Sequence, residues 1–237
     1  MTRRQFLTGL GLLALAPLRL RPPVLRPPGA REDFLARCIR CGKCLEACPY
    51  DTLRPLGITA GANAHTPYIE PLTTPCYLCH ERGPDGVDRP LSKFLRCTEA
   101  CPTGALRKIE NDKEVLATLP EELRIGVSVL QEELCLAWQF DVCGECYYNC
   151  PLKDKAMMDS PPYLAKEGGL RPWVNPKHCV GCGMCNYVCP VREEVAQARM
   201  QAPLSLYEAR YASMVRNLLG RAGPGAKLPA VRVLPRT

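Results

Sequence analysis

Cysteine is the residue type in this chain that could do chemistry. The 237 residues include sixteen cysteines, which fall into four groups of four, each ending in a Cys-Pro pair. Two groups share the spacing C-x2-C-x2-C-x3-C-P: Cys38, Cys41, Cys44 and Cys48, and then Cys179, Cys182, Cys185 and Cys189. The two groups between them are looser: Cys76, Cys79, Cys97 and Cys101, and then Cys135, Cys143, Cys146 and Cys150. The repeat uses every cysteine in the chain.

Four thiolates at this spacing are suited to hold a [4Fe–4S] cluster. Such a cluster needs four sulfur ligands, and in bacterial runs of this kind the fourth cysteine ligates a second cluster. Gly42, Gly181 and Gly183 lie between these cysteines, where glycine lets the backbone approach closely and adopt positive φ. The spacing therefore predicts four [4Fe–4S] clusters with all sixteen cysteines as iron ligands.

Two other uses of the cysteines are weighed against this prediction. An even number of cysteines in an exported chain could form disulfides, but such frameworks are typical of chains under about 100 residues. Zinc sites also use C-x2-C pairs, but they do not require a third cysteine two residues later and a fourth before proline. The regular spacing favours iron–sulfur clusters over both.

The N-terminus has the pattern of an export signal. Arg3 and Arg4 precede an apolar run that ends near Ala16. A run of about 13 residues is short for a membrane span, which needs about 20, and suits the central part of a signal peptide. We therefore expect export by the twin-arginine route to the periplasm or the outer face of the cytoplasmic membrane. The signal could end at Ala16 or at Ala30, or stay uncleaved.

The charge of the chain gives no indication of nucleic-acid binding. The formal net charge is +7, and the first 30 residues carry five arginines and no acidic residue. Cluster-bound thiolates would add negative charge to the remainder and make it mildly acidic. The few aromatic residues do not alternate with basic ones, as stacking platforms for bases would require.

The predicted fold is α+β, built from tandem bacterial two-cluster ferredoxin-like units that are small and rich in loops, with a C-terminal helix. The expected organisation is a signal and Pro/Arg-rich linker (1–30), a first unit (31–110), a second unit (111–200), and a C-terminal helix with a flexible tail (201–237). The expected elements are a helix over 32–38, strands at 68–69, 123–129 and 173–174, a polar connector over 111–122, a helix over 205–219 and an unstructured end over 221–237.

Groups suited to catalysis are few. The three histidines, His65, His80 and His178, are scattered along the chain, and two of them adjoin cysteines. A structural or surface role is expected for all three. No nucleophile motif, phosphate-binding loop or dinucleotide fingerprint is present in the sequence. We therefore expect an electron carrier rather than an enzyme, with Trp138 and Phe140 shielding a cluster from water.

With these features together, the chain resembles the NapG/MauM family of ferredoxin-type proteins. The more specific matching segments are residues 66–68 (TPY), 101–106 (CPTGAL) and 125–129 (IGVSV). The resemblance implies a periplasmic, membrane-associated electron carrier. Its partners would be an integral-membrane quinol-oxidising iron–sulfur protein and a periplasmic reductase, such as nitrate reductase, or a cytochrome. The MauM branch is associated with methylamine oxidation. One departure is the long spacer over 80–96, which could be an insertion that contacts a different partner.

Two ligand pairings are left open by the sequence. The crossed ferredoxin rule joins each run of three cysteines to the last cysteine of the neighbouring group. It gives Cys38, Cys41, Cys44 with Cys101; Cys76, Cys79, Cys97 with Cys48; Cys135, Cys143, Cys146 with Cys189; and Cys179, Cys182, Cys185 with Cys150. The alternative nests the groups, first with fourth and second with third, as in the iron–sulfur subunits of molybdenum oxidoreductases. A tightly bound subunit of such an enzyme is accordingly the second functional hypothesis.

Overall fold

The computed structural model describes residues 24–82, 87–123, 125–140, 143–164, 169–191 and 230–235 of the chain. The elements in these ranges are short: the α-helices have four to six residues and the strands two to four. The helices are α2 (Phe34–Arg37), α3 (Lys43–Glu46), α4 (Arg96–Glu99), α5 (Lys113–Thr118), α6 (Pro120–Leu123), α7 (Leu136–Phe140), α8 (Glu145–Tyr148) and α9 (Met184–Val188), with 3-10 turns η1 (Ile58–Asn63) and η2 (Glu132–Leu134).

The strands in the described ranges form two-stranded antiparallel sheets. They are β1 (Leu53–Pro55) with β2 (Pro67–Ile69), β3 (His80–Arg82) with β4 (Asp88–Pro90), β5 (Val127–Leu130) with β8 (Val231–Leu234), and β6 (Met157–Met158) with β7 (Trp173–Val174). Their registers pair Leu53 with Ile69, His80 with Pro90, Val127 with Leu234, and Met157 with Val174. Because a two-stranded sheet is only marginally stable by itself, tertiary packing must hold these pairs together.

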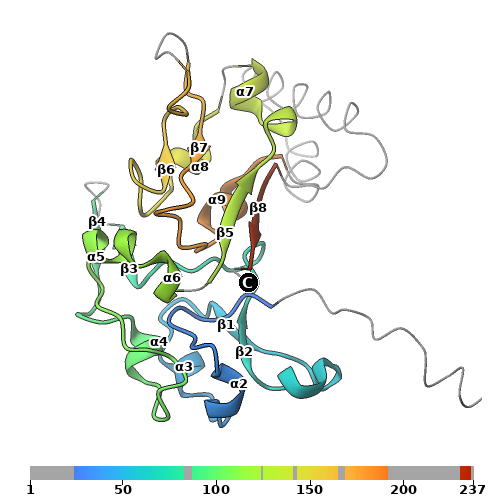
Figure 1. Cartoon of the computed structure of the whole chain (residues 1–237), viewed down its shortest axis with the longest axis vertical. Coiled ribbons are helices and arrows are strands. Elements are labelled where there is room, and N and C mark those ends of the chain that lie inside the picture. The colour runs from blue at the N-terminus through green and yellow to red at the C-terminus, as the bar shows by residue number, and fades with distance from the viewer. Residues whose placement is uncertain are drawn as a thin grey trace, which may run out of the picture.

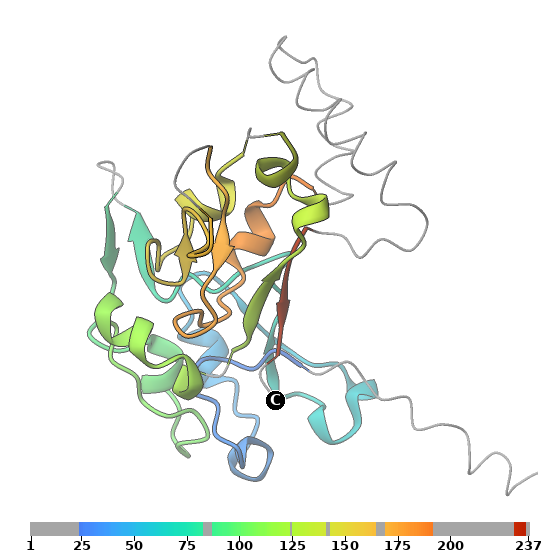
Figure 2. The same cartoon turned by 45° about the horizontal axis from the view of Figure 1, so that its top comes forward.

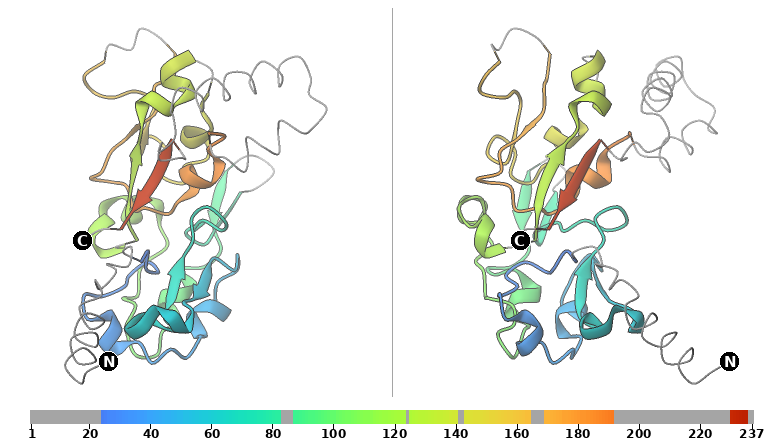
Figure 3. Two further views of the ribbon diagram at one scale, coloured as in Figure 1. Left: turned by 90° about the vertical axis from the view of Figure 1, so that its right-hand side faces the viewer. Right: turned by 45° about the vertical axis from the view of Figure 1, so that its right-hand side comes forward.

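The elements gather into two lobes, which Figure 1 shows stacked along the long axis. The first lobe is built around α2, α3, α4, β1 and β2, and the second around α7, α8, α9 and the strands β5 to β8. Figures 2 and 3 show the same division from other sides, with β5 and β8 running side by side in each view. The chain passes between the lobes once, at the end of α6, so the two lobes follow one another in sequence.

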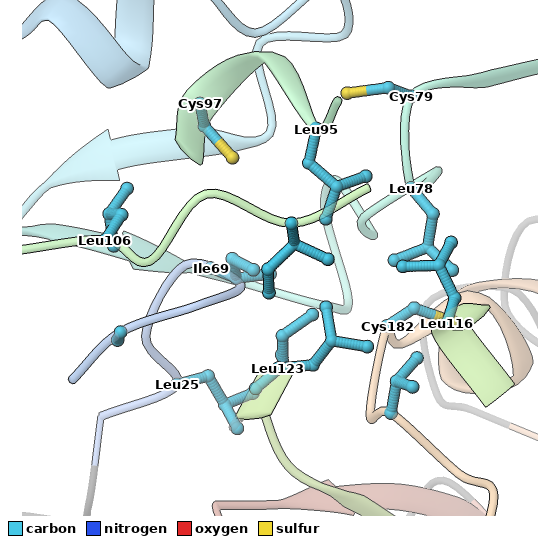
Figure 4. Packing of buried hydrophobic residues seen from close by; sticks show 14 of the residues in the cluster. Leu25, Ile69, Leu78, Cys79, Leu95, Cys97, Leu106, Leu116, Leu123 and Cys182 are labelled. Atoms are coloured by element: carbon cyan, nitrogen blue, oxygen red, sulfur yellow. The ribbon is translucent and has the colours of Figure 1, made fainter. Parts of the chain in front are cut away.

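One hydrophobic cluster runs through the first lobe and into the second. Its buried leucines come from the N-terminal segment, from the loop after Cys76 and from α5 and α6, and Figure 4 shows several of them with cysteines among them. Leu116 of α5 and Leu123 of α6 have no exposed surface. The prediction of a polar connector over 111–122 is therefore wrong, because the apolar side of two short helices is packed into the core. Asp112 caps the N-terminus of α5 and accepts hydrogen bonds from the N–H groups of Glu114 and Val115. Aspartate is a preferred N-cap residue, so the sequence contained a signal for the start of this helix.

The N-terminal segment from residue 24 onward belongs to the first lobe. Leu25 and Ala30 are buried, the N–H of Ile69 donates to Leu25 O at 2.9 Å, and the N–H of Arg107 donates to Gly29 O at 2.7 Å. Gly29 has φ +76°, and a Cβ there would lie 2.5 Å from Arg107 O. The prediction of an extended linker over 17–30 is therefore wrong for residues 24–30, because these residues are packed against the first lobe. The predicted signal lies outside the described residues.

The C-terminal residues also form structure. Strand β8 pairs with β5, and Ala230 just before it is buried. The prediction of an unstructured end over 221–237 is wrong for residues 231–234, where the β-branched residues Val231 and Val233 stand in strand β8. The predicted helix over 205–219 lies outside the described residues.

Several local predictions are confirmed. The helix expected over 32–38 is α2, the strand expected at 68–69 lies within β2, and the strand expected at 173–174 is β7. The strand expected over 123–129 begins later, as β5, because Leu123 ends α6. The long spacer over 80–96 contains the β3–β4 hairpin. Among the described residues, no helix has the length and apolar character needed to cross a bilayer.

Candidate cluster-binding sites

The sixteen cysteines, all within the described residues, are brought together in four groups of thiols. Site 1 is a pocket lined by the first three cysteines of the first run and by the last cysteine of the second group: Cys38, Cys41, Cys44 and Cys101. Burial, together with the nearby thiols of Cys38, Cys101 and Cys41, raises the pKa of Cys44 to about 11. Site 1 is the most open group, since Cys41 is exposed.

Site 2 combines the rest of these two groups: Cys48, Cys76, Cys79 and Cys97. Burial raises the pKa of Cys97 well above its usual value, and the thiols of Cys76, Cys79 and Cys48 add to that shift. Cys79 and Cys97 are buried, in contrast to the exposed Cys41 of site 1. Site 2 therefore lies inside the molecule.

The second lobe repeats this arrangement. Burial and the thiols of Cys182, Cys185 and Cys179 raise the pKa of Cys150, which defines site 4 as Cys150, Cys179, Cys182 and Cys185. Burial raises the pKa of Cys146 well above its usual value, and the thiol of Cys185 in site 4, followed by those of Cys135, Cys143 and Cys189, adds to the shift. These residues define site 3 as Cys135, Cys143, Cys146 and Cys189.

The packing of the helices bears on the two ligand pairings that the sequence left open. In each lobe, a short helix from one motif packs against a short helix from the other, α3 against α4 and α8 against α9. Each of these helices carries a cysteine: Cys44, Cys97, Cys146 and Cys185. This packing brings cysteines of two neighbouring motifs together in each lobe, as the crossed pairing requires. It favours the crossed pairing over the nested one, which would join the first motif to the fourth and the second to the third.

The residues of the sites fit an iron–sulfur cluster by the chemistry of their donors. Each site offers four thiols, and all sixteen cysteines are free of disulfides. Main-chain and hydroxyl groups point at the sulfurs: the Leu106 N–H donates to Cys101 Sγ at 3.4 Å and the Ser128 N–H to Cys179 Sγ at 3.4 Å. Hydrogen bonds to cluster sulfurs are one means of setting a reduction potential. Across the described ranges, no group of three or more His, Cys, Asp or Glu is placed to hold a single metal ion.

Burial and hydrogen bonding act on the thiols in opposite directions. Burial raises the pKa of Cys76 and of Cys182 to about 12 in each case. At Cys101 burial acts in the same direction, but hydrogen bonds from the backbone over 103–106 and from the Thr103 hydroxyl outweigh it and lower the pKa. A thiolate on iron is deprotonated outright, so the buried sites would be charged only when a cluster occupies them.

Ser128 is a site residue that the sequence analysis did not identify. Its hydroxyl lies 3.1 Å from Cys185 Sγ while its N–H donates to Cys179, so this one buried residue of β5 contacts two thiols of site 4. Serine in a strand gives no signal of such a role, because the contact depends on how β5 packs against residues about 50 positions later. Thr103, which follows a Cys-Pro pair, contacts Cys101 in site 1.

The aromatic residues expected to shield a cluster lie on α7. Phe140 packs against the hydrophobic cluster that contains Cys146, Cys185 and Cys189, in agreement with a shielding role at site 3. The Trp138 indole N–H donates to Pro172 O at 3.0 Å, which ties α7 to the loop before β7.

The histidines belong to local structure. Nδ1 of the buried His80 lies 2.9 Å from Leu78 O, and Nδ1 of His178 lies 2.7 Å from Ala117 O. His65 has a positive φ of 59° at the end of η1. Each therefore has a structural placement of the kind that the sequence analysis expected.

Comparison with known proteins agrees with these sites. Residues 37–105 match the family described as 4Fe-4S dicluster domain, and this range contains every cysteine of sites 1 and 2. Residues 179–193 match the family described as 4Fe-4S binding domain. Among curated relatives, the ferredoxin-type protein NapG of Escherichia coli strain K12 is 34% identical over 188 residues, covering 77% of this chain and 71% of the relative. This chain belongs to the NapG/MauM family of ferredoxin-type proteins.

Other NapG/MauM relatives give the same result. NapG of Haemophilus influenzae is 39% identical over 176 residues, covering 71% of this chain and 56% of the relative. The methylamine utilization ferredoxin-type protein MauM of Methylorubrum extorquens is 36% identical over 189 residues, covering 77% of this chain and 76% of the relative. No solved structure matches the chain. As a NapG/MauM protein, the chain is an iron–sulfur electron carrier with [4Fe–4S] cofactors.

Proposed function

We propose that this protein is an exported electron carrier with four [4Fe–4S] clusters, one in each of sites 1 to 4. The observation that carries the proposal is the packing of α3 against α4 and of α8 against α9, which brings cysteines of two motifs together in each lobe. No cysteine is left over for another purpose. Its partners would be a membrane-bound quinol-oxidising iron–sulfur protein on one side and a periplasmic reductase or cytochrome on the other.

The clusters would supply reversible one-electron chemistry, and the residues of the chain would bind and tune them. Three of the four cysteines of site 4 and two of the four of site 2 are buried, so the protein limits the access of water to these sites and keeps their charge in a medium of low polarity. Ser128 and the backbone N–H groups donate to the ligand sulfurs, which favours the more negative, reduced state. No bond of a substrate needs to be formed or broken in this role.

The location proposed for this carrier is the periplasm or the outer face of the cytoplasmic membrane. It rests on the pairing of Arg3 and Arg4 with an apolar run. The twin-arginine route carries folded proteins, which suits a chain whose cofactors must be inserted before export. Detection of the protein in the periplasmic fraction, and its loss when both arginines are replaced by lysine, would support this location.

A carrier in methylamine oxidation is the second candidate, favoured by the similarity to MauM proteins of Methylorubrum extorquens and other bacteria. The two candidates differ in the protein that accepts or donates electrons, not in the cofactor. Copurification with a nitrate reductase or with a methylamine-oxidising enzyme separates them.

Metal analysis tests whether the protein contains iron–sulfur clusters and how many. Anaerobically purified protein is expected to contain roughly 16 irons and the same amount of acid-labile sulfide per chain, four of each for every cluster. Roughly eight irons would reduce the proposal to two clusters, and iron near zero would overturn it.

Replacing single ligands should affect single clusters. Cys41→Ser changes the exposed site 1 and Cys182→Ser changes the buried site 4. Each variant is expected to lose or alter one component of the electron paramagnetic resonance (EPR) spectrum of the reduced protein. The loss should be larger for Cys182→Ser, because serine there is also buried. Spectra of both variants that equal the parent spectrum would contradict the ligand roles.

A further inference from the structure

The two copies of the perfect cysteine motif lie in opposite surroundings. In the first copy the loop between the ligands faces solvent: Ile39 is 64% exposed, and Arg40 and Cys41 are also exposed. In the second copy the equivalent residues, Val180 and Cys182, are 2% and 8% exposed. The two motifs share their cysteine spacing but not the residues between the cysteines, and the second copy is in addition covered by other parts of the chain.

Residues of the first lobe help to cover the second copy. A Cβ on Gly183 would lie 2.6 Å from Pro71 Cβ, so the backbone there is in close contact with the proline. The N–H of Cys76 donates to Cys182 O at 2.7 Å, directly between ligand cysteines of site 2 and site 4. We call these two contacts the joint.

The joint brings site 2 and site 4 next to each other. Burial raises the pKa of Cys182, and the thiol of Cys76 contributes to that shift across the joint. Cys182 also belongs to the same hydrophobic cluster as Cys79 and Cys97 of site 2, as Figure 4 shows for these three residues. The boundary between the lobes is therefore also the boundary between two cluster sites.

The other two pairs of neighbouring sites each lie within one lobe. Site 1 adjoins site 2 through the α3–α4 packing, and the thiol of Cys44 affects that of Cys97. Site 4 adjoins site 3 through the α8–α9 packing, and the thiol of Cys185 affects that of Cys146. Sites 1 and 3 thus lie on the far sides of their lobes.

We propose that the joint positions sites 2 and 4 as the inner pair of a single row, in the order site 1, site 2, site 4, site 3. This inference deepens the proposed function and rests on it, because the row has meaning only when clusters occupy the sites. The row runs out of sequence order, with the last motif in the middle and the first motif at an open end. Gly183, Pro71 and the Cys76–Cys182 hydrogen bond are the positioning elements.

Gly183→Ala tests the joint, with Gly42→Ala as its matched control. Both glycines directly follow the second cysteine of a perfect motif, and both precede a short helix with positive φ, +86° and +77°. An added Cβ meets Pro71 at Gly183, whereas it meets nothing within 4 Å at Gly42. The backbone strain is therefore alike in the two variants, and only Gly183→Ala forces the lobes apart.

The readout is magnetic interaction between clusters in the full chain, purified anaerobically and fully reduced. The parent protein and Gly42→Ala are expected to show the same spin–spin broadening of the EPR spectrum. In Cys182→Ser, loss of the site 4 cluster should remove the broadening that this cluster causes in the signal of site 2. Gly183→Ala is expected to lose the same part of the broadening. A Gly183→Ala spectrum equal to that of Gly42→Ala overturns the joint.

A double variant distinguishes a specific effect of the Pro71 contact from general misfolding of Gly183→Ala. Pro71→Gly removes the atoms nearest to the new Cβ, so Pro71→Gly with Gly183→Ala is expected to regain the broadening and the iron content. Failure of this rescue overturns the role of the Pro71 contact. An iron-free parent protein would instead overturn the proposed function, so the two failures are distinguishable.

Discussion

Removal of iron is expected to abolish the cooperative unfolding transition of this protein. Isolated helices shorter than about 12 residues are marginal in water, and the described α-helices have four to six residues. Two-stranded sheets are marginal as well. Neither kind of element can persist by itself, so the lobes depend on what fills the space between them.

Thiols make up much of that space. Cysteines of all four sites line the two hydrophobic clusters, where they take the place of larger apolar side chains. Without a cluster, each site becomes a gap lined by sulfur, and the cost of a cavity rises with its volume, by about 24 cal/mol for each Å³. The apolar side chains of the two clusters, such as Leu116 and Leu123, then remain packed around these gaps.

Circular dichroism and thermal melting of the chelator-treated protein check this expectation. The appropriate control is the same sample after anaerobic reconstitution with iron and sulfide, which should regain the parent transition. A sharp melt of the iron-free protein near the parent melting temperature would contradict it.

A chain that begins at residue 31 is expected to be several kcal/mol less stable than one that begins at residue 24. The seven residues removed bury Leu25 and Ala30 and supply the main-chain hydrogen bonds of Leu25 and Gly29. Arg26 also donates to Thr66 Oγ1 at 2.6 Å and lies over the Phe34 ring. Burial of a leucine contributes about 1.5–3 kcal/mol, and each hydrogen bond contributes about 0.5–1.5 kcal/mol.

Denaturant unfolding of the two holo chains, with iron content measured in parallel, gives the comparison. Leu25→Ala in the longer chain is expected to reproduce a part of the loss. Leu35→Ala serves as its control, because Leu35 is 45% exposed and its truncation should cost little. Equal stability of the two chains would show that residues 24–30 do not contribute to the core.

This expectation bears on where an export signal could end. Cleavage after Ala30, one of the ends considered from the sequence, would remove these packed residues, although the proposed twin-arginine route carries folded proteins. A signal that ends upstream of residue 24, or one that stays attached, is compatible with the packing of Leu25. Sequencing the N-terminus of the exported protein would test this interpretation.

The amino-acid sequence by itself determined the cofactor type, the number of ligand groups and the family. Cysteine ligation can be recognised in the sequence because a cluster requires both a residue type and a local spacing, as in Cys38 to Cys48. Short local elements such as α2 and β7 were predictable for the same reason, since their signals lie in neighbouring residues.

The tertiary structure decided the relations between distant segments. The contact of Ser128 with site 4, the packing of Leu25 and the pairing of β8 with β5 each join residues more than 40 positions apart. Gly42 and Gly183 hold the same position in the same cysteine spacing, yet a Cβ at Gly183 would meet Pro71, whereas one at Gly42 would meet nothing within 4 Å. A motif specifies its own loop, but what covers that loop depends on the packing of the whole chain.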